Sequence, residues 1–113
     1  MRNRTRQAVL GDAVDVADTQ AKRNTGLLKH SQLGPGEGLW IDTWSVHTFF
    51  MKFPIDLVYL DKKRKVRKVR KAVPAWRLSA CLTAHSILEL PAGTIEATGT
   101  QAGDVIEIEK LTE

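Results

Sequence analysis

The fold is decided by one stretch of the sequence, VHTFFMKFPIDLVYL at residues 46–60. β-Branched and aromatic residues dominate this stretch, and they favour the pleated, packed surface of a β-strand. Pro54 interrupts it, and because proline lacks an amide donor it marks a strand start, an edge or a bulge. We therefore predict that two strands meet at Pro54. The second, from Ile55 to Leu60, is almost continuously apolar, as expected of a core strand covered on both faces.

A hairpin is predicted directly after this core strand. Asp61 and the basic residues up to Arg64 form a polar turn, and residues 65–73 return as the partner strand. In the returning strand Val66 and Val69 are three residues apart, whereas side chains on one face of a strand recur every two residues. The pattern fits a strand only if a β-bulge lies between the two valines.

Turn residues and alternating apolar residues place the remaining elements around this hairpin. The predicted strands are Val14–Val16, Leu39–Ile41 after a Gly-rich turn, Ser86–Leu90 and Val105–Glu109, and the predicted helices are Gln20–Thr25 and a short segment between Pro91 and Gly99. Many short strands with two short helices indicate an α+β, mostly β domain, and we expect a small mixed β-barrel-like architecture.

Length and composition indicate one domain. The chain has 113 residues, 42% of them hydrophobic and 27% charged, which is typical of a globular protein with a core of its own. We expect an ordered core over residues 8–110 and a flexible basic N-terminus over residues 1–7. The lone cysteine, Cys81, allows no intrachain disulfide and fits a reducing compartment.

The sequence predicts neither export nor membrane insertion. After the basic residues at positions 2–6, the apolar stretch is only Ala8 to Leu10, whereas a signal peptide needs about 7 to 15 apolar residues. The apolar stretch around residues 46–60 contains His47, Lys52 and Asp56 and is shorter than the ~18 residues of a membrane span. We therefore expect a cytoplasmic protein.

The positive charge is concentrated in the predicted hairpin. The formal net charge is +4, but residues 62–71 hold eight of the 17 basic residues and no acid. The other nine basic residues face 13 acidic ones, a net charge of −4. Such a run is typical either of a solvated edge strand protected from aggregation or of weak, sequence-independent binding to a polyanion. The candidate polyanion-binding residues are Lys62, Lys63, Arg64, Lys65, Arg67, Lys68, Arg70 and Lys71.

Asp56 is a carboxylate in the most apolar predicted strand. Burying it is costly unless it is paired or hydrogen-bonded, and the candidate partners are His47, Thr48, Lys52 and Arg77. One interpretation is a structural polar network that fixes the bend at Pro54. The other is that Asp56 and His47 lie close together and line a pocket.

The aromatic residues have two interpretations of their own. Aromatic residues at strand spacing usually belong to a core, and Met51 reads as a core filler. Trp44 lies in the polar setting Asp42-Thr43-Trp44-Ser45, where an exposed indole could stack on a sugar or a base.

No pattern in the sequence predicts a metal, a cofactor or a catalytic nucleophile. Cys81 and His85 are four residues apart, but there is no CxxC pair and no HExxH motif. The glycines at positions 34–38 lack the lysine and the following helix of a phosphate-binding loop, and a serine nucleophile elbow is missing.

Several separated segments together are similar to the family called domain of unknown function 192. The segments are Val14–Thr19, Gly26–Leu28, Gly36–Ile41, Ser45–Asp56, Pro74–Arg77, Leu88–Thr94 and Gly103-Asp104. The resemblance implies a small mixed β-barrel-like domain without an established activity. Many relatives carry an export signal or a lipoprotein start, which this sequence lacks, and the dense basic turn at Lys62 to Arg64 departs from the family pattern.

These observations favour a non-enzymatic binding or accessory module with a site around residues 47–56 and an unknown ligand or partner. The predicted ligand-binding residues are His47, Thr48, Met51, Lys52, Asp56, Trp40, Trp44 and Arg77. One alternative is nucleic-acid or polyanion binding through residues 62–71, and a second is an enzyme that uses His47 and Asp56.

Overall fold

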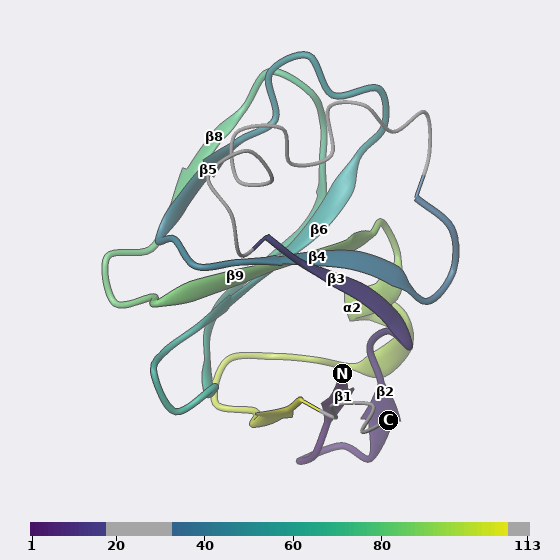
Figure 1. Ribbon diagram of the computed structural model, residues 1–113, viewed down its shortest axis with the longest axis vertical. Coiled ribbons are helices and arrows are strands. Elements are labelled where there is room, and N and C mark those ends of the chain that lie inside the picture. Colours follow the sequence, from purple (N-terminus) through teal and green to yellow (C-terminus); the bar gives the residue numbers. More distant parts are fainter. Residues whose placement is uncertain (18–32, 109–113) are drawn as a thin grey trace.

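The computed structural model describes residues 1–17 and 33–108, and these residues form an α+β, mostly β structure, as predicted (Figure 1). The predicted helix at residues 20–25 lies outside the described residues. The elements are β1 (Arg2–Asn3), β2 (Ala8–Val9), β3 (Ala13–Ala17), β4 (Glu37–Ile41), β5 (Ser45–His47), β6 (Ile55–Leu60), β7 (Val66–Val73), β8 (Leu78–Ala80), β9 (Ser86–Pro91), α2 (Thr94–Thr98) and β10 (Ile106–Glu107).

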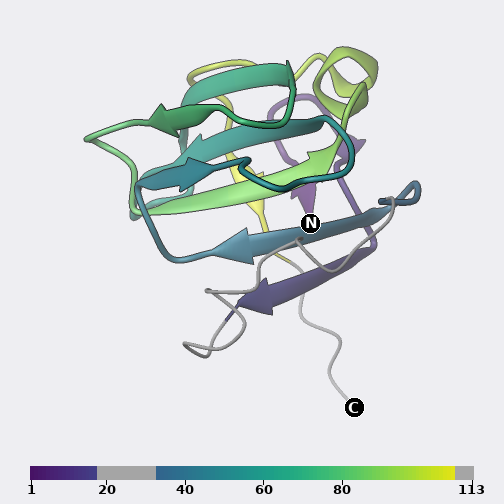
Figure 2. The same ribbon diagram turned by 90° about the horizontal axis from the view of Figure 1, so that it is seen from above.

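A five-stranded sheet with the order β3-β4-β9-β6-β7 forms the centre of the molecule. β3 and β4 run parallel, and the other neighbours are antiparallel. Figure 2 shows β3 at the outer edge of the sheet, next to β4. All six residues of β6 are buried, which confirms the prediction for Ile55 to Leu60.

The sheet separates two hydrophobic clusters. Ile55, Leu57 and Tyr59 of β6 point to one face, where β5 and β8 pack, whereas Val58 and Leu60 point to the other, which is covered by α2 and a small sheet. Fully burying one such aliphatic side chain contributes roughly 1.5–3 kcal/mol. The alternation along β6 therefore assigns each residue of the central strand to one of two opposite surfaces.

The hairpin of β6 and β7 contains the predicted bulge. Tyr59 pairs with Lys68 and Leu60 pairs with Val66, so Arg67 is the extra residue between them. This returns both Val66 and Val69 to the same cluster, on the face of Leu60. A second register shift lies at the other end of β7, between the partners of Ile55 and Leu57.

The sheets of the described residues do not close into a barrel, contrary to the barrel-like expectation. Besides the central sheet there is a three-stranded sheet with the order β10-β1-β2 and a two-stranded sheet of β5 and β8. β3 and β7 remain as the two edges of the central sheet. Closure requires continuous pairing between edges, and strands of two or three residues in separate sheets cannot supply it.

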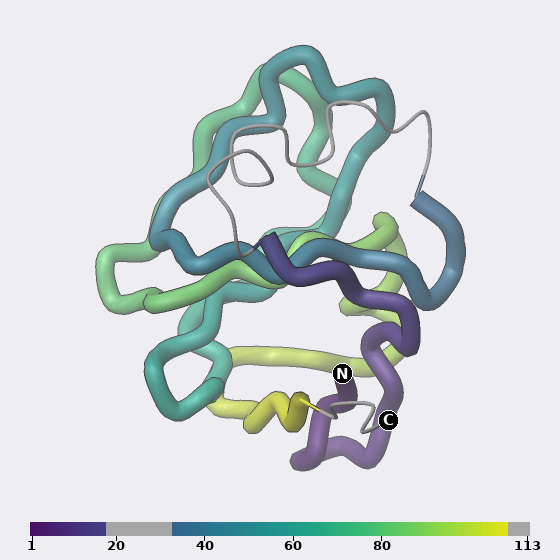
Figure 3. Tube along the Cα trace, viewed as in Figure 1, coloured from purple at the N-terminus to yellow at the C-terminus, as the bar shows by residue number. Residues whose placement is uncertain are grey.

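The start of the chain, which was expected to be a flexible arm, contributes a strand to the small sheet. Arg2–Asn3 is the middle strand of the small sheet, and Asn3 is fully buried. Figure 3 shows this start of the chain beside the strand that ends the described part. A run of polar and basic residues suggested mobility, but Asn3 is stabilised by side-chain partners that lie about a hundred residues away in the sequence.

Candidate functional site

Thr48 joins the two loops that contain most of the predicted ligand-binding residues. Its amide donates to the carbonyl of Arg77 (2.9 Å), and its hydroxyl donates to the carbonyl of Pro74 (2.6 Å) while accepting the amide of Arg77 (2.9 Å). Its carbonyl accepts the amide of Trp76 (3.1 Å). Thr48 is buried, and these bonds fix it against residues 74–77.

This scaffold presents four aromatic rings, which we call the aromatic surface: His47, Phe49, Phe50 and Trp76. The ring centroids are 4.9 Å apart for His47 and Phe49, 5.6 Å for Phe49 and Trp76, and 4.6 Å for Phe50 and Trp76. The first contact is tilted, the second stacked and the third edge-on, which are favourable geometries for aromatic pairs. Phe50 is 68% exposed and Trp76 is 57% exposed.

Two of these rings are held on strained backbone. The φ angles of Phe50 and Trp76 are 64° and 65°, in the left-handed region that bulky side chains avoid. Conformations of this kind cost about 1–3 kcal/mol and persist where the surrounding structure enforces them. Here the hydrogen bonds around Thr48 supply that constraint, so two large apolar side chains are kept in water at a cost in stability.

Exposed cations neighbour the residues of the aromatic surface along the chain, and a further apolar side chain lies opposite it across a strand pair. Lys52 lies in the first loop and Arg77 in the second, and both are exposed. His47 pairs with Leu78 across β5 and β8, and Leu78 is 72% exposed. A shallow depression of about 410 Å³ lies between β5 and β8. The surface therefore combines aromatic, aliphatic and positively charged groups.

Asp56 lies on the opposite face of the central sheet and does not pair with His47. Its Oδ1 accepts the amide of Ala72 and its Oδ2 accepts the amide of Ile95, both at 2.8 Å. Neither partner is one of the four predicted candidates. The alternation of β6 directs Ile55 and Leu57 towards β5 and therefore turns Asp56 towards α2.

The other predicted ligand-binding residues are distributed between the core and the surface. Met51 is buried in the cluster on the β5 side, and its amide donates to the carbonyl of Thr48. Trp44 is 50% exposed, as its polar setting suggested. Trp40 lies on the face of the central sheet opposite β5, where it lines a separate cleft. The structure thus brings His47, Thr48 and Arg77 together and leaves Asp56 and Trp40 elsewhere.

The basic hairpin has its most exposed charges at its turn. Lys62, Lys63, Arg64 and Lys65 are all exposed, and among the described residues none of them forms an ion pair with an acid. Further along β7, Lys71 pairs with Glu96 at 2.8 Å, the Nζ of Lys68 donates to the carbonyl of Ala80, and the Nε of Arg67 donates to Thr83. The side chain of Arg70 is half-buried.

Glu89 in β9 is a buried acid that the sequence analysis did not single out. Glu89 is 5% exposed, no hydrogen bond to its carboxylate is present within residues 1–17 and 33–108, and burial raises its pKa to about 7. The sequence held the same signal that singled out Asp56, an acidic residue within an apolar strand. The expectation that the aromatic residues belong to a core fails for Phe50 and Trp76, because their left-handed backbone leaves no trace in composition or spacing.

The described residues contain no group of three or more His, Cys, Asp or Glu side chains that could hold a metal ion. Cys81 is half-buried, and its Sγ lies 3.3 Å from the hydroxyl of Thr83. In the same part of the chain no helix has both the length and the apolar character that crossing a membrane requires.

Comparisons with known proteins place the sequence among uncharacterised relatives. Residues 1–108 match the family DUF192, described as an uncharacterized ACR. A UPF0127 protein of Thermococcus sibiricus is 33% identical over 95% of this chain and 73% of its own length, and one of Thermococcus gammatolerans is 32% identical over 92% and 71%.

Two solved structures share the fold. A protein of Sinorhizobium meliloti, described as a candidate transcription regulator, superposes with a TM-score of 0.77 at 22% identity over 83% of this chain and 79% of its own. A protein of unknown function from Novosphingobium aromaticivorans superposes with a TM-score of 0.76 at 19% identity over 84% and 74%. At these identities the likeness concerns the fold alone.

Proposed function

We propose that this chain, which belongs to the DUF192 family, is a non-enzymatic binding module that recognises a partner through the aromatic surface. Because that family is described as uncharacterised, the function has to be inferred from the site. The observation that carries this proposal is the exposure of Phe50 and Trp76 on left-handed backbone. Strain of this kind concentrates at functional sites, where it is part of the binding or switching mechanism. Contiguous exposed apolar side chains are likewise typical of interaction sites.

The chemistry of the surface favours a protein partner with apolar and acidic groups. The rings and Leu78 offer apolar area, and the few residues that carry most of the binding energy at protein interfaces are enriched in Trp and Arg. Lys52 and Arg77 at the edge would attract carboxylates and orient the partner. We expect the recognised segment to carry an aromatic or large aliphatic side chain close to Asp or Glu.

Selection from a random displayed-peptide library tests this proposal without a known partner. The library is panned on the wild-type protein and, in parallel, on a Phe50→Ser/Trp76→Ser double variant. Wild-type selection should enrich peptides that combine apolar and acidic residues and that bind the double variant at least about tenfold more weakly. Peptides that bind both proteins equally, or no enrichment on the wild type, would overturn the proposal.

The geometry gives no support to an enzyme that uses His47 and Asp56 together. Both oxygens of Asp56 accept backbone amides, and the ring of His47 packs on Phe49. A carboxylate orients an imidazole only within hydrogen-bond reach, and these two side chains lie on opposite faces of the sheet. Asp56 therefore reads as a structural residue.

Polyanion binding through the basic hairpin is a second candidate function. Its support is the cluster of exposed cations from Lys62 to Lys65, which have no acidic partner among the described residues. Phosphates of a duplex would neutralise these charges and release counterions. This binding would be weak and independent of sequence, because the turn offers no element that reads base edges.

The salt dependence of binding to a random DNA duplex measures this second function. If four phosphates are contacted, log K should fall with log salt with a slope of about −3.6. Lys63→Gln/Lys65→Gln should reduce the slope to about −1.8, because two contacts are lost. The Phe50→Ser/Trp76→Ser variant is the matched control, and its slope should equal that of the wild-type protein. A slope near zero for the wild-type protein would show that the hairpin makes no phosphate contacts.

A further inference from the structure

A cleft of about 580 Å³ lies at the end of the central sheet where the hairpin turns. The ends of β3 and β4, the turn between β6 and β7 and the start of β9 meet there. Its volume falls within the range of small-molecule sites in proteins, roughly 300–1,000 Å³. The side chains that give it chemical character are Trp40, Asp42, Asp61, Lys62, Arg64 and His85.

The backbone of the turn is fixed by Asp61. Oδ1 of Asp61 accepts the amides of Lys63 and Lys65, both at 2.9 Å, and its carbonyl accepts the amide of Arg64 at 2.9 Å. The carbonyl of Arg64 accepts the amide of Ile106, which anchors the turn to β10. Asp61 is thus hydrogen-bonded to the backbone of the turn, and these bonds fix the backbone of residues 63–65.

Arg64 occupies a strained position above the wall of the cleft. Its φ angle is 61°, a conformation that suits glycine and that costs other residues about 1–2 kcal/mol. From there its guanidinium lies 5.5 Å from the ring centroid of Trp40, within the range of a cation–π contact. An arginine at this position brings a positive charge to the cleft at the expense of backbone stability.

The charged groups that line the cleft are two cations, Lys62 and Arg64, and two carboxylates, Asp42 and Asp61. Asp61 is engaged in the turn, and Asp42 lies 3.3 Å from Nδ1 of His85. Lys62 and Arg64 have no acidic partner within the described part of the chain. The formal charges of these four groups balance, but Lys62 and Arg64 are not paired with an acid there and can hold an anionic group.

The wall formed by Trp40 adds a flat apolar surface. Trp40 lines the cleft, and its buried Nε1 has no hydrogen-bond acceptor among the described residues. Flat rings pack favourably on an indole, and Arg64 can extend the stack through its planar guanidinium. Together with the cations of Lys62 and Arg64, this wall indicates the shape and charge of a ligand.

We propose that this cleft binds a small organic anion with a flat ring system, whose ring lies against Trp40 and whose negative group is held by Arg64 and Lys62. Aromatic nucleoside monophosphates and aromatic carboxylates share this chemistry. The proposal is independent of partner binding at the aromatic surface, because the two sites have no residue in common.

Titration of the full chain by ¹H–¹⁵N NMR, with AMP and indole-3-acetate as probes, tests the site. Either probe should saturate and shift the amides of Asp42, His85 and Ser86, and the tighter of the two identifies the anionic group. Adenosine alone and inorganic phosphate alone should bind more weakly than AMP, because each lacks half of the recognised chemistry. No saturation up to about 10 mM, a response of phosphate equal to that of AMP, or shifts confined to residues 47–50 and 76–78 would overturn the proposal.

Variants localise the binding energy. Arg64→Gly removes the guanidinium, relieves the left-handed strain and keeps the backbone bonds of the turn, so it should fold and bind the tighter probe at least about tenfold more weakly. Lys65→Gln is the matched control, because this exposed cation lies in the same turn outside the cleft, and it should change the affinity by less than about twofold. Trp40→Leu should also weaken binding, and affinities that neither Arg64→Gly nor Trp40→Leu alters would overturn the assignment.

Discussion

Phe50 combines two unfavourable features, an exposed ring and a left-handed backbone. The free-energy cost of the left-handed backbone can be measured separately from the cost of exposing the ring. In most positions alanine is more stable than glycine, because glycine loses more conformational entropy on folding. At a φ of 64° the order should reverse, since only glycine adopts this conformation without steric cost.

We therefore expect Phe50→Gly to be more stable than Phe50→Ala by about 1 kcal/mol in the free energy of unfolding measured by denaturant titration. Phe49 is the matched control: it lies in the same aromatic surface, but its backbone is not left-handed. Phe49→Ala should be more stable than Phe49→Gly. If the alanine variant were more stable than the glycine variant at both positions, the backbone at Phe50 would not be strained.

Glu89 makes stability depend on pH near neutrality. Its pKa is raised by burial from 4.5 to about 7. Between these two pH values the folded state holds a proton that the unfolded state has released. The favourable contribution of the neutral carboxyl is complete below about pH 4.5 and is lost as the pH rises through 7. Above pH 7 the folded protein must bury a charge.

Glu89→Gln removes this titration and nearly preserves the side-chain volume. The difference in unfolding free energy between the variant and the wild type should shift in favour of the variant by about 2 kcal/mol between pH 5 and pH 8. Chemical denaturation at a series of pH values measures the shift. Parallel pH profiles for the two proteins would contradict the assigned protonation of Glu89.

Asp56 and Glu89 illustrate what sequence patterns reveal about single residues. An acid in an apolar strand is a visible signal, and it correctly marked Asp56 as a buried polar group that needs partners. Its partners were not predictable, because backbone amides of Ala72 and Ile95 have no sequence signature. The aromatic surface was not predictable for a similar reason, since the exposure of Phe50 and Trp76 depends on backbone angles that have no sequence signature.

At the scale of elements, Asp56 connects three of them. It lies in β6, its Oδ1 holds the irregular end of β7 at Ala72, and its Oδ2 accepts the amide of Ile95 in the first turn of α2. Ala72 has a φ of 47°, and α2 has no capping side chain of its own. Asp56 therefore acts as an N-cap supplied by a distant strand.

Asp56→Ala should lower the free energy of unfolding by about 3 kcal/mol, because the buried amide of Ile95 and the part-buried amide of Ala72 lose their acceptor. Hydrogen exchange should accelerate most at the amides of Ala72 and Ile95. Glu107→Ala is a suitable control, since this exposed acid in β10 should change stability by less than about 0.5 kcal/mol. An equal loss for both variants, or unchanged exchange at the two amides, would argue against the anchoring role.

Most elements were predictable from local patterns. Apolar alternation and turn residues located β3, β4, β6, β7 and β9, and the spacing of Val66 and Val69 located the bulge. The absence of barrel closure among the described residues was not predictable, because it depends on which short strands pair in separate sheets. Pairing of this kind is a long-range property that single strands do not encode.

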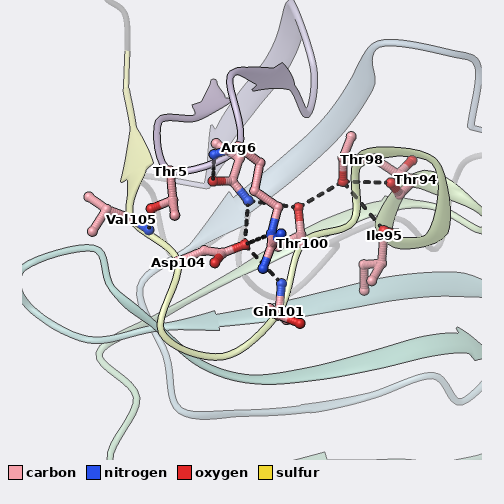
Figure 4. A network of polar contacts seen from close by, with 10 residues as sticks. Thr5, Arg6, Thr94, Ile95, Thr98, Thr100, Gln101, Asp104 and Val105 are labelled. Carbon is pink, nitrogen blue, oxygen red and sulfur yellow. Dashed lines mark hydrogen bonds and ion pairs between the residues drawn. The ribbon is translucent and has the colours of Figure 1, made fainter.

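At the scale of the whole molecule, a polar network joins the two distant ends of the described chain (Figure 4). Oδ2 of Asp104 accepts the side-chain amide of Asn3 at 2.8 Å, Nε of Arg6 at 2.7 Å and the backbone amide of Gln101 at 3.1 Å. The amide of Asn3 also donates to the hydroxyl of Thr100. This network explains why the first residues, which looked mobile in the sequence, form an ordered strand.

Asp104 should contribute to stability against acid. Burial would raise the pKa of its carboxyl, but the hydrogen bonds of Asn3, Arg6 and Gln101 and the charge of Arg6 outweigh burial and lower the pKa below 3.8. Its stabilising effect is therefore present above pH 3.8 and is lost as the pH falls through the lowered pKa.

Asp104→Asn should reduce the free energy of unfolding at pH 7 by about 2 kcal/mol, and the difference from the wild type should shrink in acid below pH 3.8. Thermal unfolding across this pH range measures both effects. Glu96→Gln, which removes the exposed partner of Lys71, is the control and should have no measurable effect. A constant deficit of Asp104→Asn at all pH values would contradict the role of the ionised carboxylate.

The pairing of β1 with β10 also sets the order in which the protein can be completed during synthesis. The central sheet has all of its strands once residue 91 has left the ribosome, but Arg2–Asn3 must wait for Ile106–Glu107. A contact that closes so large a loop forms late, because the entropy of the intervening chain opposes it. The nascent chain therefore carries its first strand without its final partner until nearly all described residues are made, and an arrested chain ending at residue 100 would lack that strand's last neighbour.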